Sequence, residues 1–151
     1  MLPRRLIFLI PIAFMFTACG SEEKKPPTVG ETRDFAAVCD KANDGKRVAV
    51  VGYLRLPDEL DRKSTVVLRL FPSADFSGQP VGVSSFPFGK EAQQIEFIPK
   101  DFSDKDLKVH TADGQVATSG TKVKVSGDVY YPTVGQTFQC ALSNPLVELA
   151  K

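Results

Sequence analysis

The stretch that decides the fold is residues 46–56, which read KRVAVVGYLRL. It is rich in β-branched residues and its apolar residues alternate, a pattern that predicts a β-strand with one buried face. On that face we expect Val48, Val50, Leu54 and Leu56. Gly52 interrupts the strand, and a bulge or a sharp coil of the sheet is the usual reason for a glycine there.

The same alternation recurs along the chain. Residues 64–71 predict a second strand, and residues 122–131 predict another with Gly127 in its middle. The inward positions of these two strands are Val66, Leu68, Leu70, Val123, Val125 and Val129, and the outward positions of the first are Val67, Arg69 and Phe71. A third strand is expected at residues 95–98, and residues 81–86 can pair with the sheet edge. The remaining extended segments are residues 107–111, 138–142 and 145–149, with a bend at 143–145.

Residues 32–43 have a different pattern and predict one short helix. Thr32 can cap its N-terminus, and Phe35, Val38 and Cys39 fall on one helical face. Residues 43–45, Asn-Asp-Gly, then end the helix with turn chemistry. The predicted fold class is therefore mainly β: a small antiparallel barrel of five to six strands with one short N-terminal helix.

The first residues of the chain predict export. Arg4 and Arg5 precede an apolar run at residues 6–16, which is about half the ~20 residues that span a bilayer. Phe16-Thr17-Ala18-Cys19 then resembles the lipobox of bacterial lipoproteins. The resemblance implies that Cys19 is acylated and becomes the mature N-terminus. Because Gly20 follows Cys19, rather than the Asp that retains lipoproteins in the inner membrane, the implied location is the outer membrane, on its periplasmic or surface side.

These signals divide the chain into three parts. Residues 1–18 are the expected lipoprotein signal peptide, residues 19–31 a solvated tether, and residues 32–151 a single folded domain. Without Arg4 and Arg5, the 19 basic residues fall to 17, against 18 acidic ones. This near-neutral balance argues against a nucleic-acid partner, since such binding depends on phosphate neutralisation.

The three cysteines fit this location. If Cys19 carries lipid, Cys39 and Cys140 remain, and in an oxidising compartment two cysteines of a small domain usually form a disulfide. The alternative is a redox or metal-binding pair, but the chain has no Cys-x-x-Cys motif and a single histidine, His110.

Three segments resemble parts of small OB-fold domains. Residues 45–54, GKRVAVVGYL, resemble the first strand of such a barrel, residues 122–129, KVKVSGDV, its penultimate strand, and residues 140–149, CALSNPLVEL, its closing strand. The main alternative is a β-sandwich. In the barrel interpretation, a Cys39–Cys140 disulfide ties the leading helix to the last strand.

OB-fold proteins bind ligands on the outer face of the barrel. The resemblance implies a ligand-binding face where aromatic rings stack on bases or sugars and cations hold phosphate or carboxylate. Its residues are Tyr53, Arg55, Arg69, Phe71, Lys124 and Tyr130. The alternative is that these side chains are simply the solvated side of the sheet.

Residues 71–88 hold four phenylalanines among glycines and prolines. They are either a docking surface for another protein or a loop that folds back onto the barrel end. His110, with Asp104, Asp106 and Asp113 near it in sequence, is expected to be an ordinary surface residue, and no catalytic motif is present. We therefore expect no enzyme activity, cofactor or metal. The predicted function is a lipid-anchored envelope binding or adaptor protein with an envelope protein partner. The alternative is a binder of a small anionic ligand, an oligosaccharide or a nucleotide.

Overall fold

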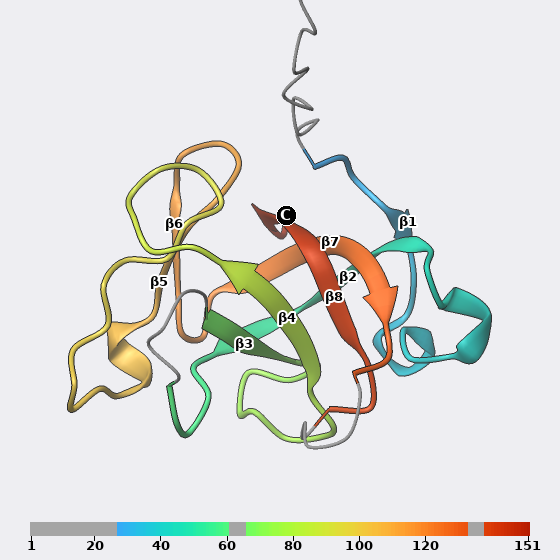
Figure 1. The fold of residues 1–151 in the computed structure, drawn as a ribbon, viewed down its shortest axis with the longest axis horizontal. Coiled ribbons are helices and arrows are strands. Elements are labelled where there is room, and N and C mark those ends of the chain that lie inside the picture. The colour runs from blue at the N-terminus through green and yellow to red at the C-terminus, as the bar shows by residue number, and fades with distance from the viewer. Residues whose placement is uncertain (1–26, 61–65, 133–137) are drawn as a thin grey trace, which may run out of the picture.

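Five strands close into a barrel in the computed structural model, which describes residues 27–60, 66–132 and 138–151 (Figure 1). In barrel order the strands are β2 (Arg47–Arg55), β3 (Val66–Phe71), β4 (Val81–Phe86), β8 (Ala141–Leu149) and β7 (Lys122–Tyr130), and β7 closes the barrel by pairing with β2. All neighbours are antiparallel except β4 and β8. The expected mainly β fold with a small closed barrel is confirmed.

Strand β2 bends because it pairs with two neighbours in turn. Its register with β7 is unbroken from Arg47 to Tyr53, and at Tyr53 it begins to pair with β3. A Cβ atom at Gly52 would lie 2.5 Å from the carbonyl oxygen of Phe71, so the close approach of β3 requires glycine there. Of the two expected reasons for this glycine, the sharp coil of the sheet applies.

Gly127 marks an irregularity between β7 and β8. The register shifts between Ser126 and Asp128, where Asn144, at φ +49°, lies in the bend of β8. A Cβ atom at Gly127 would lie 2.7 Å from the Cβ atom of Leu142. The mid-strand glycine and the expected bend of the last strand therefore belong to the same feature.

The barrel interior is the core predicted from the alternation. The expected inward residues are all buried: Val48, Val50, Leu54, Leu56, Val66, Leu68, Leu70, Val123, Val125 and Val129. Phe71 lies on the outer side of the sheet, as predicted, where it pairs with Tyr53. It is nevertheless only 6% exposed, because the Phe76 ring packs edge-on against it, with centroids 5.6 Å apart.

The segment between β4 and β7, residues 87–121, forms a cap that shares the barrel core. It contains η3 (Asp104–Asp106) and the hairpin of β5 (Lys108–His110) and β6 (Val116–Thr118), which lies to the left of the barrel in Figure 1. The prediction of a strand at residues 95–98 is wrong. Ile95 and Ile98 are buried, but Ile95 makes only isolated bridges, to Phe88 and Val109. The third barrel strand is β4.

The helix expected at residues 32–43 is also absent from this described segment. It is replaced by β1 (Glu31–Thr32), which runs parallel to β2, and by two short 3-10 turns, η1 (Phe35–Ala37) and η2 (Lys41–Asn43). The side-chain amide of Asn43 donates to the carbonyl oxygens of Ala37, at 2.8 Å, and Val38, at 3.4 Å. It thereby occupies acceptors that a continuing helix needs for its own backbone.

Several expectations lie outside the described residues. These are the signal peptide, the lipobox with Cys19, most of the tether, and the first two residues of the second strand. Where the structure does describe the chain, no helix has the length and apolar character needed to cross a membrane.

Candidate functional site

The structure brings four of the six predicted ligand-face residues directly together. Tyr53 of β2 pairs with Phe71 of β3, and Arg55 pairs with Arg69. Lys124 lies nearby on β7, opposite Val51.

Tyr130 does not join this group. It lies eight residues along β7 from Lys122, the partner of Tyr53, which is about 26 Å at the usual rise of a strand.

Each cation of the predicted face already has a carboxylate partner. Arg55 Nε lies 3.0 Å from Asp104, and its guanidinium group also lies over the Phe76 ring, 5.3 Å from the centroid. Arg69 Nη1 donates to Asp58 at 2.6 Å. Lys124 Nζ lies 2.9 Å from Glu148. An anionic ligand must therefore compete with an internal carboxylate for every one of these cations.

A polar pocket of about 430 Å³ opens beside Arg55, between the end of β2 and the cap. The ionisable side chains in its lining are Arg55, Lys100, Asp58, Asp101 and Asp104. Among the described residues, three carboxylates stand against two cations, and this balance disfavours an anion. No group of three or more potential metal ligands occurs among the described residues.

The phenylalanines of residues 71–88 pack against the protein and form no exposed patch. Phe71 and Phe86 are buried, Phe76 is half-buried against Phe71, and Phe88 is half-buried against the core. Of the two interpretations of this loop, the structure supports folding back onto the barrel.

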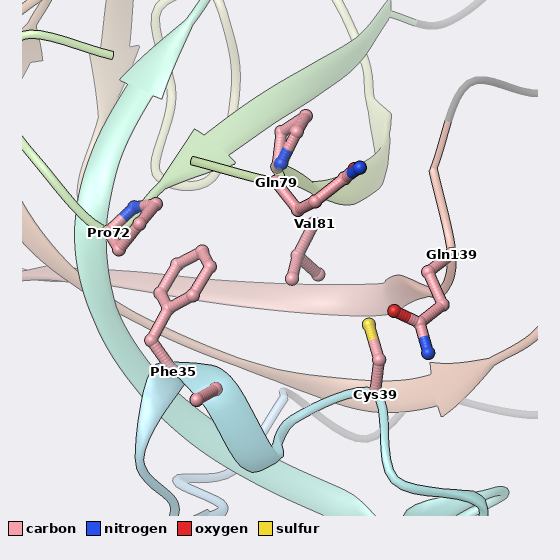
Figure 2. A pocket seen from close by; sticks show the side chains of 8 residues that line it. Phe35, Cys39, Pro72, Gln79, Val81 and Gln139 are labelled. Atoms are coloured by element: carbon pink, nitrogen blue, oxygen red, sulfur yellow. The ribbon is translucent and has the colours of Figure 1, made fainter. Parts of the chain in front are cut away.

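A second pocket, not expected from the sequence, lies at the end of the barrel where β4 begins. It has a volume of about 430 Å³. Its lining residues are Phe35, Ala36, Cys39, Pro72, Gln79, Pro80, Val81 and Gln139. In Figure 2, Phe35 and Cys39 project from the turn region below toward Val81 above, and Gln139 closes one side. We call this the barrel-end pocket.

Three segments that are distant in sequence form the barrel-end pocket: the turns before β2, the loop between β3 and β4, and the residue before Cys140. The disulfide between Cys39 and Cys140, with Cα atoms 5.4 Å apart, joins the first segment to the last. Tyr131 adds a second link, since its hydroxyl donates to the carbonyl oxygen of Cys39 at 2.7 Å. The expected disulfide is present, and it was the one sequence signal that placed residues 35–39 near residue 139.

The chemistry of the barrel-end pocket differs from that of the outer strand face. None of the eight described side chains that line it is ionisable, because the one cysteine among them is disulfide-bonded. Its polar side chains are two carboxamides, Gln79 and Gln139, both exposed and without a hydrogen-bond partner among the described residues. A mainly apolar cavity with a few polar groups is typical of a binding site.

His110 lies in the cap, outside both pockets. Its Nε2 atom lies 3.1 Å from Glu96. Partial burial opposes ionisation of Glu96, but the hydrogen bond from His110 and the charge of Lys108 hold the pKa of Glu96 below its ordinary value. The histidine therefore belongs to a local polar contact within the cap.

No protein-family model matches the chain, and no curated protein shows significant sequence similarity to it.

Proposed function

We propose that the chain is a lipid-anchored, non-enzymatic binding or adaptor protein of the bacterial envelope, and that it holds its partner at the barrel-end pocket. The observation that carries the proposal is the pocket itself: a cavity of about 430 Å³ that opens to solvent, has a mainly apolar lining and has no ionisable side chain among its described lining residues. Its walls are fixed by a disulfide. A preformed site of this kind binds without a large ordering cost.

The anchoring part of the proposal rests on the lipobox resemblance at residues 16–19. A lipoprotein cysteine carries several acyl chains, and two or more chains give stable membrane attachment. The Cys39–Cys140 disulfide supports an oxidising compartment. The five-stranded barrel supports the resemblance to OB-fold domains, which commonly serve as binding modules.

The alternative function, binding a small anionic ligand, an oligosaccharide or a nucleotide on the outer strand face, has one supporting observation. The buried Nε atom of Arg69 has no hydrogen-bond partner among the described residues. Against it stand the carboxylates that pair with Arg55, Arg69 and Lys124. Salt-sensitive binding of a nucleotide or an anionic oligosaccharide that Arg69→Ala abolishes is the result that favours this alternative.

The test of the leading proposal is site-specific crosslinking in native membranes. A photo-reactive amino acid replaces Ala36, which lines the pocket, or Ala42, an exposed alanine of η2 outside it. We expect a discrete crosslinked product from position 36 and none from position 42. We also expect Cys19→Ser to release the protein from the membrane fraction. Equal products from both positions contradict the pocket, and unchanged membrane attachment of Cys19→Ser contradicts the anchor.

A further inference from the structure

We infer that the occupant of the barrel-end pocket is an extended peptide segment, which inserts one uncharged apolar side chain and aligns its backbone with Gln79 and Gln139. This inference rests on the proposed function and names the chemistry of its partner. It follows from the size of the pocket, from its lack of charge and from the two carboxamides at its rim.

The size of the pocket limits how large a ligand can bind in it. Sites for small molecules range over about 300–1,000 Å³, and this pocket, at about 430 Å³, lies near the lower end. It has room for one large side chain with part of the adjoining backbone. Pro72, Pro80 and the disulfide restrict the movement of its walls, so the cavity exists before the partner arrives.

The side chains that line the pocket limit the chemistry of the ligand. The ring of Phe35 and the side chain of Val81 offer contacts to an aliphatic or aromatic group. No described lining residue carries a charge that could form an ion pair with a charged side chain. A Lys or Glu side chain would therefore lose hydration on entering without gaining an ion pair, which is a costly transfer. The pocket therefore selects side chains such as Leu, Met or Phe.

The carboxamides distinguish a peptide from other apolar ligands. Gln79 precedes β4 and Gln139 precedes β8, so the two groups reach the rim from different segments. Each carboxamide offers both an N–H donor and a carbonyl acceptor, and neither is used within the described part of the chain. A peptide backbone presents a donor and an acceptor at nearly every residue. An acyl chain presents neither along its length, so both carboxamides would stay hydrogen-bonded to water and contribute nothing to its binding.

The experiment is a titration of the complete mature chain, residues 19–151 with Cys19→Ser, followed by NMR at the Val81 methyls and the side-chain amides of Gln79 and Gln139. The probes are acetyl-Gly-Leu-Gly-amide, its Ala and Lys counterparts, and decanoate. We expect the Leu peptide to bind at least about tenfold tighter than the Ala peptide, since three more carbons are buried, and the Lys peptide to bind no better than the Ala peptide.

Three variants test whether the peptide binds in the barrel-end pocket and not elsewhere on the protein. Ala36→Trp fills the pocket and should abolish the shifts, whereas Ala42→Trp should leave them unchanged; well-dispersed spectra and an intact disulfide show that both are folded. The double variant Gln79→Ala with Gln139→Ala should weaken the Leu peptide about tenfold.

Four outcomes overturn the inference: no shift with any peptide, equal binding of the Leu and Lys peptides, unchanged peptide affinity in the double glutamine variant, or decanoate displacing the Leu peptide at equal concentration. None of these outcomes changes the crosslinking result at position 36. A pocket that crosslinks in membranes but prefers decanoate keeps the proposed function and loses the peptide.

Discussion

Arg47 joins three segments that are far apart in the sequence. Its Nε donates to the carbonyl oxygen of Thr28 at 2.6 Å, its Nη1 to Asp128 at 3.2 Å, and its Nη2 to the carbonyl oxygen of Asn144 at 3.0 Å. One planar guanidinium group therefore holds the segment that precedes β1, a residue of β7 and the bend of β8. A lysine carries the same charge but cannot present donors in this fixed fork.

We accordingly expect Arg47→Lys to lower the free energy of unfolding by about 1–2 kcal/mol, because at least one of these charge-assisted hydrogen bonds is lost. Urea unfolding of the mature protein measures the change. Arg33→Lys is the matched control: among the described residues the Arg33 side chain pairs only with the exposed Glu31, so its effect should stay within about 0.5 kcal/mol. Equal unfolding midpoints for the two variants would show that the fork geometry of Arg47 does not matter.

Asp75 stabilises the loop between β3 and β4 in a way that depends on pH. Side-chain hydrogen bonds from Ser73 and Ser77, and the backbone N–H of Ser77, lower its pKa from 3.8 to about 2. A depressed pKa in the folded state means that the stabilisation is present above pH 3.8 and is lost as the pH falls through 2.

The variant Asp75→Asn should therefore lose less stability than the wild type when the pH falls from about 4 to about 2. Urea unfolding at several pH values in this window compares the two proteins. An NMR titration of the wild-type carboxyl group provides the direct check. A midpoint near the ordinary value of an aspartate would contradict both the hydrogen bonding and the expected difference in slope.

At the scale of elements, the cap completes the hydrogen bonding of β8. The parallel pairing of β4 with β8 covers only Gly82 with Ala141 and Val83 with Leu142. Further along β8, the side chain of Gln93 takes the place of a neighbouring strand. Its Oε1 accepts from the Val147 N–H at 2.6 Å, and its Nε2 donates to the Val147 carbonyl oxygen at 3.2 Å. A single carboxamide thus acts as a peptide group at the seam between barrel and cap.

Replacing Gln93 with Ala should cost about 1–3 kcal/mol, because the N–H of a buried strand residue loses its partner. The backbone at residue 93, with φ +63°, carries the same Cβ atom in both proteins, so the change isolates the carboxamide. Hydrogen exchange should speed up at the Val147 amide more than elsewhere in β8. Gln115→Ala, at an exposed position where Asp113 is the only described acceptor of the side chain, should leave both quantities unchanged.

Strands were predictable from the sequence where the barrel imposes a strict alternation on them. β2, β3 and β7 have one face in the common core, so every second residue is apolar and the pattern is visible. β4 was harder to recognise, because Gly82 and Ser84 weaken its pattern and prolines flank it. The apolar residues Ile95 and Ile98 led to the prediction of a strand, but they are apolar because the cap buries them, and they belong to no strand.

The helical prediction failed for a tertiary reason. The spacing of Phe35, Val38 and Cys39 suits a helix, but residues 32–43 must also pair with β2, reach Cys140 and return to Lys46. A short helix has little stability of its own to resist such contacts. Asp34 and Asp40 take extended conformations, and each begins a separate turn.

The candidate site was less predictable than the fold. Alternation correctly brought Tyr53, Arg55, Arg69 and Phe71 onto one face, but it carries no information on the carboxylates that pair with the cations. Those partners, Asp58 and Asp104, come from loops whose path depends on the whole fold. The barrel-end pocket draws single residues from three segments, and no local pattern identifies such a set.

At the scale of the whole molecule, the Cys39–Cys140 disulfide constrains most of the folded chain. The two cysteines are 101 residues apart, and in the chain-entropy model a loop of that length is worth up to about 4.7 kcal/mol. The bond also holds Cys39, which follows η1, close to Gln139, the neighbour of Cys140, and both Cys39 and Gln139 line the barrel-end pocket. Global stability and the shape of the proposed site therefore depend on the same covalent link.

Removing this bond with Cys39→Ala and Cys140→Ala together should lower the free energy of unfolding by about 3–5 kcal/mol, because the unfolded chain regains the freedom that the closed loop removes. Urea unfolding of wild type and double variant, each with and without a thiol reductant, measures the loss. The reductant should destabilise the wild type by a similar amount and leave the double variant unchanged. A loss below about 1 kcal/mol would mean that contacts such as the Tyr131 hydroxyl on Cys39 already hold the barrel end, and that the disulfide adds little to them.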